Sequence, residues 1–220
     1  MKKIPILLAT ALAMVFYASC SGDGDSPSSG NGNNGSQAAE NGQVYDNNDT
    51  EKPYTGNAKI YMADKRDRNT GRPILTGETM LEIGTMSNGE ITLDLPENVD
   101  SRYLREIDFA PKGLNVVPLG TEIWFYMDPL RLVNNGEHIG DLEYVKIVDQ
   151  KEYHKISYWY FSQNTIVNGT VNEGENTLKY NINAEKGWNK VYLHINAIKE
   201  EVYVTTDLSK VPDGLMWLFF

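Results

Sequence analysis

The sequence predicts an all-β protein built as an antiparallel β-sandwich. Apolar and polar residues alternate over many short segments, most clearly at residues 178–182 and 191–195. Such alternation places apolar side chains on one face of a strand, where they can be buried. Glycine-containing turns separate the segments, and the sequence has no long stretch with helical periodicity. These observations together are typical of two packed sheets.

Turn signals set the bounds of the expected elements. Asn88-Gly89 predicts a tight hairpin between two of them, because Asn-Gly readily adopts the positive φ angles of a primed turn. The one expected helix covers residues 97–106, with Asn98 as its N-cap. We expect strands at residues 57–63, 79–86, 90–95, 114–118, 121–127, 142–149, 153–161, 164–171, 176–182, 189–196, 200–206 and 214–220.

The last expected strand is apolar on both faces, because residues 215–220 read Leu-Met-Trp-Leu-Phe-Phe. If this strand were exposed, it would form an edge prone to aggregation. We therefore expect it to insert into the sheet as a buried final strand.

The first twenty residues have the order of a bacterial export signal. Lys2 and Lys3 precede an apolar run at residues 4–16, and small residues lead to Cys20. The run is shorter than the about 20 residues that a membrane-spanning helix needs, which favours a cleaved signal over a spanning helix. Cys20 is the only cysteine, so no internal disulfide can form.

The residues before Cys20 resemble the lipobox of bacterial lipoproteins, with Tyr17 in a place where that family prefers an aliphatic residue. The resemblance implies that residues 1–19 are removed as a signal peptide. It also implies that Cys20 is acylated and anchors the protein in a lipid bilayer, for which more than one acyl chain gives a stable anchor. An ordinary secreted protein is the alternative.

A tether follows the cysteine. Residues 20–43 consist mainly of Gly, Ser, Asn and Asp and cannot bury enough apolar surface to fold, so we expect them to be disordered. Ser21 stands where many inner-membrane lipoproteins carry Asp, and the acidic run that follows resembles surface-export signals of outer-membrane lipoproteins. The expected location is the outer membrane, at the cell surface or facing the periplasm.

Residues 44–220 form the expected β-sandwich domain. A strand, a polar loop, a second strand and the Asn88-Gly89 hairpin make residues 57–95 resemble transthyretin-like or immunoglobulin-like modules. A second subdomain would begin at a boundary within residues 108–120.

Composition and motifs exclude several classes of function. The formal net charge of −10 leaves no basic patch for phosphates, so we expect no nucleic-acid partner. Nucleophile-elbow, zinc-protease and phosphate-loop motifs are absent from the sequence. We therefore predict no catalytic residue, no metal ligand and no cofactor. The three histidines are interpreted as scattered surface residues, with His194 on the polar face of its strand.

Two acidic segments have alternative interpretations. Carboxylates along residues 122–143 would suit a hydrolase that acts on polysaccharides, but a solvated acidic face explains them better. Residues 46–51 carry oxygen ligands close together, as a calcium loop does. They lack the order of an EF-hand loop and are interpreted as the end of the tether.

Aromatic residues give the strongest sign of a ligand. Two expected strands carry rings on both faces, so one face must be buried and the other is either buried too or forms a flat platform on which sugar rings stack. The residues of this candidate platform are Trp124, Tyr126, Tyr158, Trp159 and Tyr160.

The function expected from these patterns is non-catalytic. A membrane-anchored lipoprotein would use this domain to bind or scaffold, with a polysaccharide or an envelope protein as its partner. The alternatives are a polysaccharide hydrolase based on carboxylates and a purely structural envelope lipoprotein.

Overall fold

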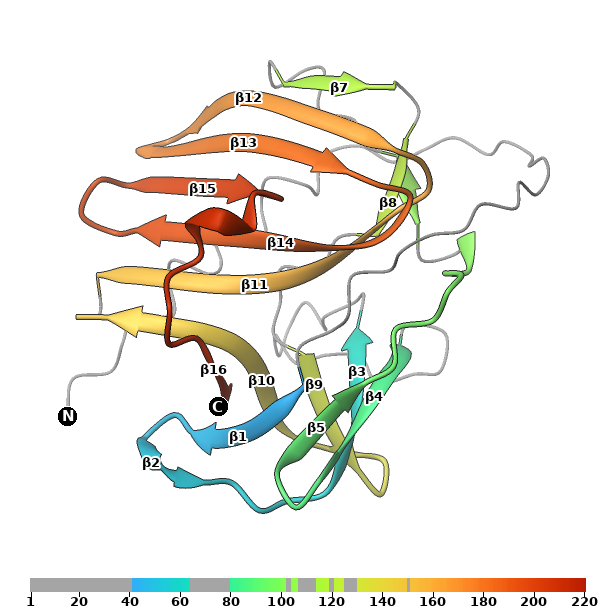
Figure 1. Ribbon diagram of the computed structural model, residues 1–220, viewed down its shortest axis with the longest axis vertical. Helices are drawn as coiled ribbons and strands as arrows, with labels where there is room; N and C mark the ends of the chain where they lie inside the picture. The colour runs from blue at the N-terminus through green and yellow to red at the C-terminus, as the bar shows by residue number, and fades with distance from the viewer. Residues whose placement is uncertain are drawn as a thin grey trace.

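The chain folds as an all-β protein, as the sequence predicts. The computed structural model describes residues 41–63, 80–101, 104–106, 114–118, 121–124, 130–149 and 151–220 (Figure 1). Their regular elements are strands and short 3-10 turns such as η4 (Leu208–Lys210). Within these ranges no helix has the length and apolar character needed to cross a membrane.

Seven strands close into a barrel in the lower half of Figure 1. The hydrogen-bonded order is β16-β1-β5-β4-β3-β9-β10, and β10 pairs again with β16 to close the ring. The bounds of these strands are β1 (Gly42–Asp46), β3 (Ala58–Ala63), β4 (Met80–Ser87), β5 (Glu90–Leu93), β9 (Leu130–Asn134), β10 (Glu137–Val148) and β16 (Met216–Phe219).

The same sheet continues beyond the barrel, in the upper half of Figure 1, in the order β10-β11-β14-β15-β13-β12-β7. The bounds of the added strands are β7 (Asn115–Val117), β11 (Glu152–Phe161), β12 (Thr165–Glu173), β13 (Asn176–Ala184), β14 (Gly187–Asn196) and β15 (Glu201–Thr205). Three short strands lie off this path: β2 (Asp49–Pro53) pairs with β1, β8 (Glu122–Trp124) with β11, and β6 (Arg105–Glu106) with β8.

Two hydrophobic cores lie on opposite faces of β11. Tyr158 and Tyr160 belong to the core inside the barrel, whereas Trp159 and Phe161 belong to a second core under β12–β15. Because successive side chains of a strand point to opposite faces, the aromatic run at residues 158–161 of β11 serves both cores. Further along the sheet, β13 has one buried face, formed by residues such as Leu178, and keeps the alternation read from the sequence.

The continuous hydrogen bonding means that the predicted sandwich of two sheets is not confirmed. The described strands form one sheet, part of which is closed. Two finer predictions are wrong: Arg105 and Glu106 are strand β6 and not part of a helix, and the supposed end of the tether at residues 46–51 lies in the β1–β2 hairpin. There Asp46 accepts a hydrogen bond from the backbone amide of Asn48, so its carboxylate stabilises a turn.

Two Asn-Gly turns have positive φ angles at both residues, as predicted for Asn88-Gly89. Asn88 and Gly89 have φ angles of 50° and 78° and join β4 to β5, while Asn135 and Gly136 have φ angles of 50° and 83° and join β9 to β10. Backbone hydrogen bonds also hold the first turn against its neighbours. The Val44 amide donates to the carbonyl of Gly89, and the Gly89 amide donates to the carbonyl of Gly56.

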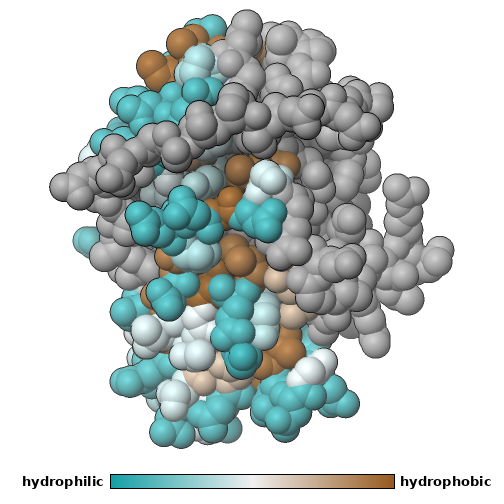
Figure 2. Space-filling model, turned by 90° about the vertical axis from the view of Figure 1, so that its right-hand side faces the viewer, coloured by the Kyte–Doolittle hydropathy of each residue, from teal (hydrophilic) through white to brown (hydrophobic). Residues whose placement is uncertain are grey.

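The final strand is buried, which confirms the prediction from its apolar sequence. β16 pairs in parallel with β1 and in antiparallel with β10, and Trp217 and Leu218 are almost fully buried. At the other end of the sheet the apolar residues Val117 and Ile166 are register partners and are exposed. Figure 2 shows hydrophobic colour at this upper end of the molecule, where β7 and β12 lie.

Candidate functional site

The predicted aromatic platform is wrong for the three residues of β11. Tyr158, Trp159 and Tyr160 are 3 %, 0 % and 5 % exposed, because both faces of this central strand are covered by core. No ring of theirs is available to stack on a sugar. The Trp124 side chain and all of Tyr126 lie outside the described residues, as does Cys20.

Two carboxylates of the acidic stretch, Asp141 and Glu143, form ion pairs and so depart from the solvated face that the sequence suggests, whereas Glu137 is exposed. The Asp141 carboxylate lies 2.6 Å from Nη1 of the buried Arg131. The Glu143 carboxylate lies 2.7 Å from Nζ of Lys155, and both of those side chains are largely buried. Tyr153 donates a further hydrogen bond to Glu143. These carboxylates are held by cations that come from neighbouring strands.

Polar side chains gather on one face of the extended sheet. The face is the continuation of the barrel's inner surface across β11, β14, β15 and β13, beyond the point where the barrel closes. Five residues that pair side by side across adjacent strands form one row on this face: Lys146, His154, His194, Tyr203 and Lys179. The next row contains Glu152, Asn196, Glu201 and Thr177. We call this surface the polar face.

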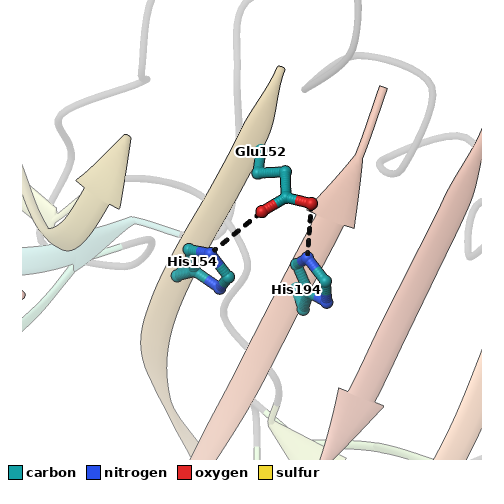
Figure 3. Close-up of side chains that lie close together, drawn as sticks. All are labelled: Glu152, His154 and His194. Carbon is teal, nitrogen blue, oxygen red and sulfur yellow. Dashed lines mark ion pairs between the residues drawn. The ribbon is translucent and has the colours of Figure 1, made fainter. Parts of the chain in front are cut away.

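Two histidines and a glutamate meet on the polar face (Figure 3). The rings of His154 and His194 are stacked, with centroids 4.6 Å apart and planes inclined by 14°. The Glu152 carboxylate reaches both rings, with oxygens 3.8 Å from Nε2 of His154 and 4.0 Å from Nε2 of His194. The three residues come together because Glu152 and His154 lie two positions apart on β11, and His194 lies opposite His154 on β14.

Two neighbours hold this cluster in place. Nδ1 of His154 is 2.7 Å from the hydroxyl of Tyr192, in a buried hydrogen bond. Asn196 donates a hydrogen bond of 2.9 Å to Glu152, and its own side-chain oxygen accepts from the backbone amides of Ile198 and Lys199.

Burial sets the protonation states in the cluster. It lowers the pKa of His154 below its ordinary value, and the neighbouring His194 and Lys146 lower it further, against the opposing charge of Glu152. Burial, together with Glu152, raises the pKa of Tyr192 to about 12. At neutral pH the cluster therefore holds a neutral His154 beside a neutral tyrosine hydroxyl.

An open hollow of about 310 Å³ adjoins the cluster, with His194 and Asn196 in its wall. Its remaining lining residues are Lys179, Lys199, Glu201, Val202 and Tyr203. Lys179 and Glu201 are joined by a 2.6 Å ion pair. The hollow thus offers both hydrogen-bond donors and acceptors to a bound molecule.

Sequence reasoning missed this site, because 40 positions separate His154 from His194. The pattern Glu152-Tyr-His154 was a usable signal, since residues two apart on a strand share a face. Placing His194 beside them also needs the pairing of β11 with β14, which alternation alone does not give.

Comparison with protein families, curated proteins and solved structures finds no match to this chain.

Proposed function

We propose that the protein is an exported, lipid-anchored binding module and that it binds its ligand non-catalytically in the hollow of the polar face. The observation that carries the proposal is the hollow itself, an open volume of about 310 Å³ lined mostly by residues with polar groups. Such a volume lies near the lower end of the range for small-molecule sites. The signal-like residues before Cys20 support the export and the anchor.

A glycan is the proposed class of ligand. The hollow carries amide, ammonium, carboxylate and phenol groups within one surface, and such groups can match the many hydroxyls of a sugar. Recognition would rest on hydrogen bonds donated by Asn196 and Lys199 and accepted by Glu201, since the rings of β11 are buried. The ion pairs that engage Asp141 and Glu143 favour binding over a hydrolase built on that acidic stretch.

A binding screen tests the hollow. The full-length protein in mild detergent is titrated with polysaccharides and peptidoglycan fragments and followed by calorimetry. Lys199 is exposed and lines the hollow, so we expect Lys199→Ala to weaken saturable binding at least about 10-fold, the usual effect of losing a charged hydrogen bond. Lys186→Ala, an equal loss of charge at the β13–β14 turn, is the matched control and should leave affinity unchanged.

Two outcomes of that screen overturn the binding proposal: no saturable binding by any glycan, or binding that Lys199→Ala leaves intact. The anchor is tested separately by feeding expressing cells a labelled fatty acid. Label should appear in the wild-type chain and be lost in Cys20→Ser, and an unlabelled wild-type chain contradicts the anchor.

A further inference from the structure

We propose that Glu152, His154 and His194 form a binding site for one divalent transition-metal ion, with Zn²⁺ as the best fit. Two imidazoles and a carboxylate are ligands that zinc takes readily. The potential ligand atoms of these three residues all lie within 4.8 Å of one another. This inference stands apart from glycan binding, because the three protein ligands belong to the cluster and need no bound glycan.

The geometry is close to that of a bound site. Donors about 2.0–2.2 Å from a tetrahedral ion lie about 3.4 Å from one another. The cluster therefore has to contract by at most about 1.4 Å, which small side-chain rotations can supply. A sheet backbone holds the three Cα positions, since His154 and His194 are register partners in a pairing of β11 and β14 that extends from Glu152 to Phe161.

Nε2 of His194 is the candidate ligand atom that most needs a partner. Nε2 of His194 is buried and makes no hydrogen bond within the described part of the chain. A buried polar atom without a partner is costly, and a metal bond would satisfy it. The planes of the two rings are inclined by only 14°, and we expect one ring to turn so that both Nε2 atoms face the same ion. His194 is the ring free to turn, because its side chain is 32 % exposed and borders the hollow.

The other two ligands are already oriented. If the Nδ1–H of His154 donates to the Tyr192 hydroxyl, its Nε2 lone pair is directed toward Glu152. Asn196 donates to the Glu152 carboxylate and fixes its direction. Partners of this kind orient metal ligands and raise affinity in zinc proteins. The hollow beside His194 leaves room for a fourth ligand, a water molecule or a group of a bound molecule.

Zinc titration of the full-length protein, without any glycan, tests the site. We expect calorimetry to show one ion per chain. His194→Ala and Glu152→Gln should each weaken binding at least about 10-fold, and Tyr192→Phe should weaken it by about 10-fold through loss of the orienting hydrogen bond. His138→Ala is the matched control, because it removes the remaining histidine, which lies on β10 beside Asp141. It should change nothing.

Cobalt gives a second readout that reports geometry. Co²⁺ in a tetrahedral site absorbs strongly in the visible range, and this band should appear at one equivalent and vanish in His194→Ala. Thermal melting without metal verifies that each variant is folded. The inference is overturned if zinc does not bind saturably, if folded His194→Ala and Glu152→Gln bind as the wild type does, or if His138→Ala abolishes binding.

Discussion

The guanidinium of Arg131 lies 2.6 Å from the carboxylate of Asp141, and the two residues are register partners on β9 and β10. The arginine side chain is 1 % exposed, whereas that of the aspartate is 27 % exposed. Nε2 of His138 lies 2.7 Å from the same carboxylate oxygen. One partly exposed carboxylate therefore compensates a cation that is buried in the wall of the barrel.

Asp141→Asn should destabilise the fold strongly. The change keeps the shape of the side chain but removes the negative charge that lies 2.6 Å from the buried Arg131 guanidinium, and breaking a buried pair costs about 3–5 kcal/mol. Urea denaturation followed by tryptophan fluorescence measures the loss, with His138→Ala as a control that removes only the more exposed partner of Asp141. A loss no larger than that of the control would show that Asp141 does not stabilise the arginine.

The two Asn-Gly turns allow a matched test of steric strain. Gly89 and Gly136 have nearly equal positive φ angles, but an added Cβ at Gly89 would collide with the carbonyl oxygen of Tyr54, whereas one at Gly136 would meet open space. Gly136→Ala should therefore lower the free energy of unfolding by about 1–2 kcal/mol, because only the left-handed backbone conformation opposes the new side chain. Gly89→Ala should lower the free energy of unfolding by clearly more, because the turn must also move away from the backbone of Tyr54.

Chemical denaturation of both glycine variants measures the difference. Equal losses of stability would mean that the turn at Gly89 relaxes without cost and that its docking on residues 54–56 contributes nothing.

Local patterns in the sequence predict the strands well, because local chemistry determines them. Alternation places Leu178 and Tyr180 on one buried face, and Asn88-Gly89 fixes a hairpin. β9 was missed because Leu130–Val133 is buried at every position, including the charged Arg131, and so shows no alternation. β1 was missed because its five residues include only one fully buried side chain, Val44.

Pairings between distant segments could not be predicted. The barrel closes because β16, at the end of the described chain, inserts between β1 and β10, and nothing in the local sequence specifies either partner. The aromatic residues of β11 illustrate the same limit. Rings on both faces fit either a central strand or an exposed platform, and only the two cores decide in favour of burial.

Removal of residues 215–220 should prevent soluble folding. Without β16 the barrel would be open between β1 and β10, and the buried Trp217 and Leu218 side chains would be lost from its wall. Each such loss costs about 2–5 kcal/mol, which together approaches the whole stability of a typical domain. Removal of Phe220 alone, which is 42 % exposed, is the control and should leave a folded protein.

Sedimentation of cell extracts and thermal melting of the soluble fraction follow both truncations. A soluble product that lacks residues 215–220 and still melts cooperatively would contradict the closing role of β16.

Acid should weaken the fold through His154. Its pKa is lowered in the folded state, mainly by burial and then by His194 and Lys146, while Glu152 opposes the shift; Tyr192, with a pKa of about 12, stays neutral. The unfolded chain therefore takes up a proton near pH 6.5 that the folded chain still refuses, so the contribution of His154 is complete above that pH. It is lost as the pH falls from there through the lower folded-state pKa.

Chemical denaturation of the wild type and of His154→Gln, with a chelator present, isolates this effect. The free energy of unfolding is measured from about pH 8 to about pH 5. The difference between the two proteins should shrink steadily below pH 6.5, because glutamine has no proton to gain. His138→Gln, which removes an exposed histidine, corrects for general effects of losing an imidazole. A difference that stays constant across the range, or grows on acidification, would mean that the folded protein accepts the proton at His154 at least as readily as the unfolded chain.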